Sequence, residues 1–397
     1  MAEVITASVP ADRTRLQAID RLGVVLAVIG ALAVMLLPFV VFKANRIVPG
    51  DPRGLFDVLP AWRAGMTLGV LAVSGLIALF VSNARIRLVA ALVGVAVIAL
   101  SVAAAADVLT PVDNRVVRVA PGAGFWLLLV TLGLMATDAI TRVRPGPLLR
   151  VVFLVGFVAM VLLSLAQGTF DNLSVMREYA VNADRFAREV RQHMLLALGS
   201  LTAAVIVAIP IGILCHRAPR LRPGIQGTLN IVQTIPAIAL FGILMAPLGA
   251  LAAAFPLAAK LGIRGIGATP AAVALFLYSL LPIVVNTAAG LNRVSRSAVD
   301  AARGMGMTDR QVLTSIELPL ALPVIITGIR IVLVQNIGLV TIAALIGGGG
   351  LGTFVFQGIG QTAIDLVLLG AIPTVVLAFS AAVILDAIVE AMDRTRS

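Results

Sequence analysis

The chain has 397 residues, of which 60% are hydrophobic and only 12% are charged, and its mean hydropathy is +1.07. An ordinary soluble domain is about one quarter charged, so the composition excludes a soluble protein and predicts an all-α membrane protein. The net charge of +11 does not indicate a nucleic-acid partner, because the basic residues lie in short connections between apolar segments. With one cysteine, Cys215, and two histidines, His193 and His216, the sequence predicts neither a disulfide nor a metal site.

Apolar segments recur along the whole chain, and each is about long enough to cross 30 Å of hydrocarbon as a helix. The first follows Arg13, Arg15 and Arg21, as the apolar part of a signal peptide would. It is too long for that role and lacks a small-residue cleavage site, so we expect a retained span. Ten spans are predicted, near residues 22–42, 65–82, 88–106, 123–140, 151–167, 194–215, 225–249, 268–289, 321–345 and 362–390.

The charge between the spans predicts their orientation. An even number of spans places both termini on one side, and the connections on that side are short and basic. Because Lys and Arg concentrate in cytoplasmic connections, we expect a multi-pass protein of the bacterial inner (plasma) membrane with both termini in the cytoplasm. The connections concerned carry Arg85 and Arg87, then Arg142, Arg144 and Arg150, then Arg217, Arg220 and Arg222.

The spans divide into two groups joined by a polar loop. Five spans fall in residues 1–170, the outward loop in 171–192, and the remaining spans in 193–390. The loop is charged but places the apolar Phe186 and Val190 four residues apart, a spacing that predicts a short surface helix.

The longest polar interruption in the second group, residues 295–323, predicts two short helices on the cytoplasmic side. Residues 299–305 are compatible with a helix that stops at the following glycine. Thr308 stands three residues before Gln311, the spacing of a capping box, and an apolar helical face follows. Pro319 is expected to end the second helix.

The residue order in this stretch resembles the cytoplasmic signature of ATP-binding-cassette importer permeases, which reads Glu-Ala-Ala, three residues, Gly, nine residues, Ile, one residue, Leu-Pro. Every spacing matches, and Asp at the Glu position keeps the charge on a shorter side chain. The resemblance implies coupling helices that dock in a groove of an ATPase subunit; a solvated connector is the alternative. The matching residues of the coupling loop, 295–319, are Asp300, Ala301, Ala302, Gly306, Ile316, Leu318 and Pro319.

The resemblance extends over about residues 190–390 and is to permeases for osmoprotectants, such as glycine betaine, choline and related quaternary amines. It is carried by the segments that begin at Asn230, Ala274 and Ala343. It implies a type I importer permease core that is not an enzyme and needs no cofactor, preceded here by a five-helix extension. We expect the core to suffice for transport and the extension to tune assembly, regulation or lipid contacts.

The same resemblance implies several partners. The sequence contains no GxxxxGK[ST] phosphate loop, so the cytoplasmic ATP-binding-cassette ATPase is expected on a separate chain. An extracytoplasmic substrate-binding protein, a second permease copy or a paralogue, and membrane lipid complete the set.

Polar residues inside the predicted spans are candidates for the translocation path. Arg330 lies about 16 Å along a helix from Pro319, and a lipid-facing arginine there would cost about 3 kcal/mol. We therefore expect it to face the protein or a wet cavity, as a path residue or a structural lock. Its expected partners are Asn286, Gln335, Asn336 or a helix carbonyl.

Two further polar clusters surround prolines. One is Asn230, Gln233 and Thr234 before Pro236; the other contains Tyr278, Ser279, Asn286 and Thr287 around Pro282. Hydrogen bonding between helices is the common use of such residues, and a lining role in a translocation path is the alternative. The glycine run at residues 347–352 lacks the strand and helix context of a dinucleotide site and predicts a re-entrant or hinge element.

Two other classes of protein are alternatives to an importer permease. An ion-coupled secondary transporter would place carboxylates near the middle of the membrane, whereas Asp138, Asp386 and Glu390 fall near cytoplasmic ends and Asp365 near an outer end. A membrane-embedded enzyme would need a nucleophile with its base or clustered metal ligands, and the sequence offers neither.

Overall fold

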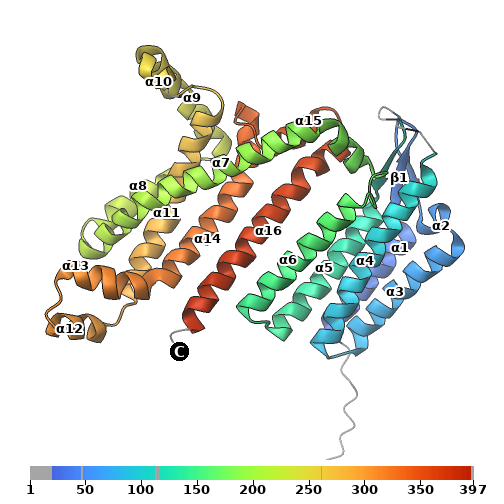
Figure 1. Ribbon diagram of the computed structural model, residues 1–397, viewed down its shortest axis with the longest axis horizontal. Helices are drawn as coiled ribbons and strands as arrows, with labels where there is room; N and C mark the ends of the chain where they lie inside the picture. The colour runs from blue at the N-terminus through green and yellow to red at the C-terminus, as the bar shows by residue number, and fades with distance from the viewer. Residues whose placement is uncertain (1–19, 46–47, 112–113, 115, 261, 395–397) are drawn as a thin grey trace, which may run out of the picture. The chain divides into compact units, whose positions relative to one another are not determined.

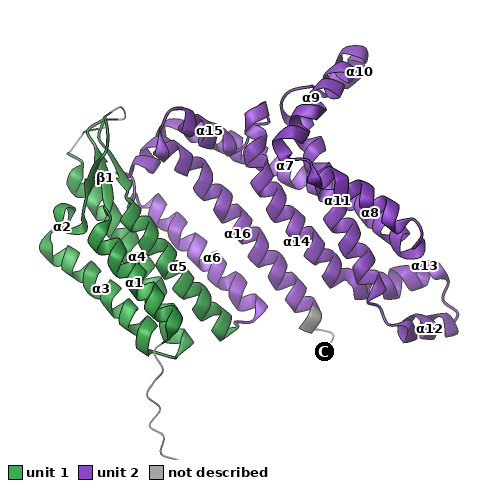
Figure 2. Ribbon diagram, turned by 180° about the vertical axis from the view of Figure 1, so that it is seen from behind, with its two compact units in different colours: residues 1–144 green, residues 145–397 purple. Residues whose placement is uncertain are grey.

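The chain folds into two compact units, residues 1–144 and 145–397, coloured separately in Figure 2. This computed structural model describes residues 20–45, 48–111, 114, 116–260 and 262–394. Within these residues, nine helices are long and apolar enough to cross a membrane, and α1 is a shorter apolar helix. The prediction of an all-α membrane protein with about ten spans is confirmed.

Unit 1 is built on four helices: α1 (Arg21–Leu36), α3 (Ala61–Phe80), α4 (Ala84–Leu109) and α5 (Ala123–Val143), with a short α2 (Leu55–Val58). Helix α1 packs against α3 and α5, and α4 packs against the same two helices. Gly23 allows the closest approach, since a Cβ atom there would lie 2.0 Å from the carbonyl oxygen of Ala78.

The first span is shorter than the sequence predicts. Helix α1 ends at Leu36, and the residues predicted to complete the span form β1 (Val40–Lys43). Pro38, which fixes φ and lacks an N–H, stands between the two elements. Strand β1 is the centre of a three-stranded antiparallel sheet with β2 (Asp51–Arg53) and β3 (Arg118–Pro121).

A cluster of four charged side chains closes one end of unit 1. Arg87, which is fully buried, donates to Asp20 and lies 3.4 Å from Asp138. Arg142 reaches both carboxylates at 3.0 Å. Burial opposes ionisation of Asp20, but hydrogen bonds from Arg87 and the Gly23 N–H, together with the charges of Arg87 and Arg142, lower its pKa to about 2. The carboxylate is therefore ionised at physiological pH.

Unit 2 contains most of the helices, and several lie side by side in Figure 1. Helix α11 packs between α7 and α14, α14 packs on α16, and α16 on α6. A central cluster including Phe241, Leu275 and Val340 joins α9, α11 and α14. The elements are α6 (Pro147–Ala166), α7 (Ser174–Arg217), α8 (Arg222–Thr234), α9 (Ala237–Ala254), α10 (Pro256–Lys260), α11 (Ala268–Asn292), α12 (Arg296–Gly304), α13 (Asp309–Val312), α14 (Leu318–Ala343), α15 (Gly352–Gly360) and α16 (Ile364–Arg394).

The predicted outward loop is not a separate surface helix. From Ser174 onward its residues belong to α7, one helix of 44 residues, which is about 66 Å long. Residues 174–192 contain neither glycine nor proline, so nothing in the local sequence separates them from the span. The predicted span 225–249 is also different, because the chain leaves helical geometry at Ile235 and Pro236, between α8 and α9.

Candidate functional site

The coupling loop contains the two predicted helices. In α12 the Ser295 hydroxyl caps the helix by accepting from the Ala298 N–H. In α13 the Thr308 N–H donates to Gln311 Oε1 at 2.8 Å, and the Gln311 N–H donates to Thr308 Oγ1 at 3.4 Å. These reciprocal bonds confirm the predicted capping box, whose partners are too close in sequence to depend on the rest of the fold.

The prediction that Pro319 ends the second helix is wrong. After α13 the chain passes through a π-helical turn, Leu313–Glu317, and continues directly into α14. Pro319 directly follows the π-helical turn, inside one helical segment that runs from Asp309 to Ile346. The coupling loop is therefore joined to a membrane span without a flexible break.

The loop presents small residues outward on an apolar base. Asp300, Ala301 and Gly306 are exposed, whereas Ala302 and Val312 are buried. Gly306 has φ +83°, a left-handed conformation that reverses the chain after α12 at little cost only for glycine. The neighbouring Met305 is 74% exposed. Its position between two glycines could have predicted that this apolar side chain is exposed.

An ion pair holds the base of the loop to another span. Glu317, in the π-helical turn, is only 3% exposed and accepts a hydrogen bond of 2.5 Å from Arg217 at the end of α7. His216 lies 3.8 Å from the same carboxylate and is hydrogen-bonded to Asn292, the last residue of α11. The ends of α7 and α11 thus position the loop.

The break between α8 and α9 brings two predicted path residues together. The Tyr278 hydroxyl, from α11, donates to the carbonyl of Ile235. Gln233 Nε2 in turn donates to the carbonyl of Tyr278 at 2.9 Å. Ile235 lies in extended geometry between α8 and α9, so its carbonyl is outside both helices and the tyrosine supplies its donor. The break is a defined structure held by α11.

The other predicted polar residues do not join this pair. Thr234 and Asn286 each bond to a carbonyl of their own helix, that of Ile231 and that of Pro282. Asn230 is exposed. Within the described residues these three side chains therefore show no common ligand cage, and their place on a translocation path stays a prediction.

Tyr278→Phe tests the helix break. The change should leave the Ile235 carbonyl without its donor and cost about 1 to 3 kcal/mol of stability if no water replaces it. We expect a lower thermal midpoint of the purified protein and slower uptake. Tyr179→Phe is the matched control, because Tyr179 is 37% exposed. Equal effects of the two changes would contradict a specific role for the hydroxyl.

Arg330 has a charged partner that the sequence analysis did not identify. It pairs with Asp386 of α16, not with Asn286, Gln335 or Asn336. Asp386 also lies 3.4 Å from Arg150 of α6, which is 3.0 Å from Glu390. Two basic and two acidic side chains thus compensate one another among α6, α14 and α16. The partners were missed because 56 residues separate Arg330 from Asp386.

Replacing Arg330 with Leu should sharply reduce uptake, because it removes one charge from this group. Arg330→Lys should retain part of it, since a point charge replaces a planar fork. The double variant Arg330→Leu/Asp386→Leu distinguishes the two roles. If the double variant recovers both the membrane level and uptake, Arg330 is a structural lock. If it recovers the membrane level but not uptake, Arg330 is a path residue. Normal uptake by Arg330→Leu would contradict both.

A buried hydrogen-bond network joins three spans of unit 2. Asn336 of α14 is fully buried and donates to Ser200 of α7 at 3.1 Å and to Ser279 of α11 at 3.0 Å. Ser279 belongs to a predicted polar cluster, whereas Ser200 was not predicted, because single serines in apolar helices carry little signal. The network fixes how the three helices face one another.

The glycine run forms a tight turn between α14 and α15, in which Gly347, Gly349 and Gly350 all have positive φ. Two side chains of helix α7 form hydrogen bonds with this turn. Glu189 accepts from the Gly350 N–H at 2.7 Å, and Gln192 donates to the Gly348 carbonyl at 3.1 Å. These contacts were not predicted, although Glu189 and Gln192 lie three residues apart on one helical face.

His193 of α7 also forms a hydrogen bond with the glycine turn. Nδ1 accepts from the Leu351 N–H at 3.3 Å, and Nε2 contacts the Ile337 carbonyl at 3.0 Å. An amide N–H only donates and a carbonyl only accepts, so the buried imidazole is neutral with its proton on Nε2. The imidazole of His193 therefore acts as a hydrogen-bonding group. The described residues contain no group of three His, Cys, Asp or Glu side chains able to hold a metal ion.

Two family models match most of the chain. Residues 20–176 match the family described as ABC transporter permease YehY, N-terminal domain, and residues 208–397 match the binding-protein-dependent transport system inner membrane component. A solved chain of the MetNI methionine ABC transporter aligns with a TM-score of 0.43 and 22% identity, over 52% of this chain and 95% of that one.

Two curated relatives cover about half of this chain and most of their own length. The osmoprotectant import permease protein OsmW of Salmonella typhimurium is 41% identical over 50% of this chain and 86% of the relative. The glycine betaine/carnitine/choline transport system permease protein OpuCD of Bacillus subtilis is 37% identical over 55% and 87%. The chain therefore belongs to the family of ATP-binding-cassette importer permeases that includes the osmoprotectant permeases.

Proposed function

We propose that this chain forms the substrate path of an ATP-driven importer for a small quaternary amine or related osmoprotectant, and that the coupling loop transmits ATPase movement to it. The observation that carries the proposal is the geometry of residues 295–319. Exposed Ala301 and Gly306 permit close approach of a partner, while the buried Glu317 fixes the base to α7. The ATPase, the external binding protein and a second permease copy or paralogue would be separate chains.

The test is uptake in vesicles that contain the permease, its ATPase and its binding protein. Labelled glycine betaine, carnitine and choline are offered separately, with methionine as an unrelated solute. We expect accumulation of at least one quaternary amine that requires ATP and does not respond to sodium or proton gradients. Gradient-driven uptake without ATP would instead support the ion-coupled secondary transporter.

Gly306→Leu should uncouple the permease from its ATPase. A side chain at φ +83° is strained by about 1 to 2 kcal/mol, and it would also obstruct the exposed turn. We expect normal membrane levels but several-fold lower ATPase co-purification and substrate-stimulated ATP hydrolysis, with a similar loss for Asp300→Lys. The control is Gly304→Ala, where a Cβ meets nothing within 4 Å and φ is ordinary. Unchanged docking and hydrolysis in both test variants would identify an ordinary connector.

The orientation and the second permease copy follow from the same proposal. With the coupling loop on the ATPase side, the positive-inside bias supports a cytoplasmic position for both termini. Cysteine labelling of Ser297→Cys from each side of the membrane tests this orientation. Co-purification of two differently tagged copies distinguishes a homodimer from a pairing with a paralogue.

A further inference from the structure

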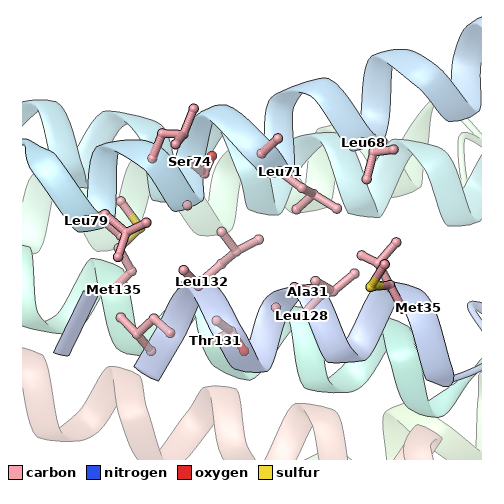
Figure 3. A pocket seen from close by; sticks show the side chains of 18 residues that line it. Ala31, Met35, Leu68, Leu71, Ser74, Leu79, Leu128, Thr131, Leu132 and Met135 are labelled. Atoms are coloured by element: carbon pink, nitrogen blue, oxygen red, sulfur yellow. The ribbon is translucent and has the colours of Figure 1, made fainter. Parts of the chain in front are cut away.

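Unit 1 contains an apolar groove to which no role has been assigned. It has a volume of about 430 Å³ and runs between α1 and α3 with α5 behind it. Figure 3 shows it extending from Leu79 and Met135 at one end to Met35 and Leu68 at the other. The groove therefore follows the direction of the spans over several helical turns.

The chemistry of the groove fits hydrocarbon. Its lining has two hydroxyl groups, and both are already bonded to backbone carbonyls. Ser74 donates to Ala90 at 3.3 Å, and Thr131 donates to Leu127 at 2.7 Å. An occupant therefore needs no polar atoms along the groove. Because the surrounding helices are membrane spans, a lipid acyl chain is the apolar molecule available at that depth.

One end of the groove leads to a basic surface. The Asp20 N–H donates to the carbonyl of Leu79, which lines the groove, and Arg142 follows Met135 by seven residues, about 10 Å along α5. The cluster of Arg87, Arg142, Asp20 and Asp138 is neutral in sum.

Three exposed arginines at the same end add positive charge to this neutral cluster. Arg21 is the first residue of α1, Arg85 is the second residue of α4, and Arg144 directly follows α5. No ion-pair partner for them is found among the described residues.

We propose that this groove binds one acyl chain of an anionic phospholipid, whose headgroup lies against Arg21 and Arg85. Basic surfaces between spans on the cytoplasmic side are suited to anionic headgroups. The groove supplies apolar contact for the chain, and the exposed arginines supply the preference for a negative charge. The extension thus carries a lipid site of its own, separate from the coupling loop and the polar residues of unit 2.

The experiment uses the full-length permease in phosphatidylethanolamine vesicles that contain a phosphatidylglycerol probe with a photoreactive group in one acyl chain. A phosphatidylethanolamine probe with the same chains is the comparison. After irradiation, labelled peptides are mapped by mass spectrometry. We expect labelling of α1, α3 and α5 at groove residues, about 25-fold stronger with the anionic probe. Arg21→Gln and Arg85→Gln should each reduce that preference about fivefold.

Filling the groove tests the acyl-chain part. Gly30 lines it, and a Cβ there would approach the Thr131 methyl at 3.9 Å, so Gly30→Leu should fit and reduce labelling about tenfold. Gly75→Leu is a second filling variant, in case the first lowers the amount of protein. Gly69→Leu is the matched control on α3, because its Cβ would meet nothing within 4 Å and it does not line the groove.

Three results would overturn the proposal. Equal labelling by the two probes in the wild-type protein would show an ordinary lipid-facing surface. Labelling that survives both filling variants would place the lipid elsewhere. Crosslinks from groove residues to another segment of this chain or to a second copy would show that protein occupies the groove.

Discussion

Gly352→Val is expected to abolish accumulation of the protein in the membrane. A Cβ atom at Gly352 would lie 1.9 Å from the carbonyl oxygen of Thr341, which is backbone of α14 and cannot rotate away. Relief requires α15 to move off α14, so the cost should be about 4 kcal/mol or more, at the upper end of single substitutions. The measurement is the level of folded protein in the membrane fraction.

Gly360→Val provides the control for this prediction. Gly360 is the last residue of the same helix, and a Cβ atom there would meet nothing within 4 Å. The control should therefore accumulate nearly normally. Comparable losses in the two variants would point to a general intolerance of valine in α15, and normal accumulation of Gly352→Val would contradict the close contact with Thr341.

Arg217→Ala should produce the second large effect, in transport more than in folding. The change leaves Glu317, which is 3% exposed, without its 2.5 Å ion pair. Loss of a partner from a buried carboxylate costs about 3 kcal/mol of stability. Here Arg217 is 36% exposed and His216 lies 3.8 Å from the Glu317 carboxylate. The expected loss of stability is therefore about 1 to 2 kcal/mol. The loop should then dock with its base displaced.

The expected measurement is substrate-stimulated ATP hydrolysis reduced at least fivefold, with membrane levels close to normal. Glu317→Gln should be milder, because its amide oxygen still accepts from Arg217. Arg220→Ala is the control, since the exposed Arg220 has no ion-pair partner within the described part of the chain. If Arg217→Ala couples normally, the ion pair does not position the loop.

The sequence predicted features that depend on local chemistry. Apolar segments of span length report where the backbone must form helices, because lipid offers no hydrogen-bond partners. The Thr308 and Gln311 cap was predictable for the same reason, since both partners lie within one turn. The exceptions are informative: Pro38 ends α1 although the apolar run continues, and the sheet pairing that follows joins Val40 to Arg53 and Pro121.

Contacts between distant helices could not be predicted in this way. Hydropathy gives the length of a span but not which face meets which neighbour. The pairing of Arg330 with Asp386 and the bonds of Asn336 to Ser200 and Ser279 depend on those helix rotations. The coupling loop was predicted from residue spacing, whereas its attachment through Glu317 depends on the position of Arg217, 100 residues earlier.

The continuity of α7 has a mechanical consequence. Its middle part holds the glycine turn through His193, and its last residue, Arg217, holds the coupling loop, about 36 Å away along the same helix. A tilt of this stretch at one contact would therefore displace the other. Pro210 lies between the two contacts, where it removes one backbone hydrogen bond and lowers the stiffness of the helix. The glycine turn and the coupling loop are thus linked through one helix, whose more pliable section lies toward the loop.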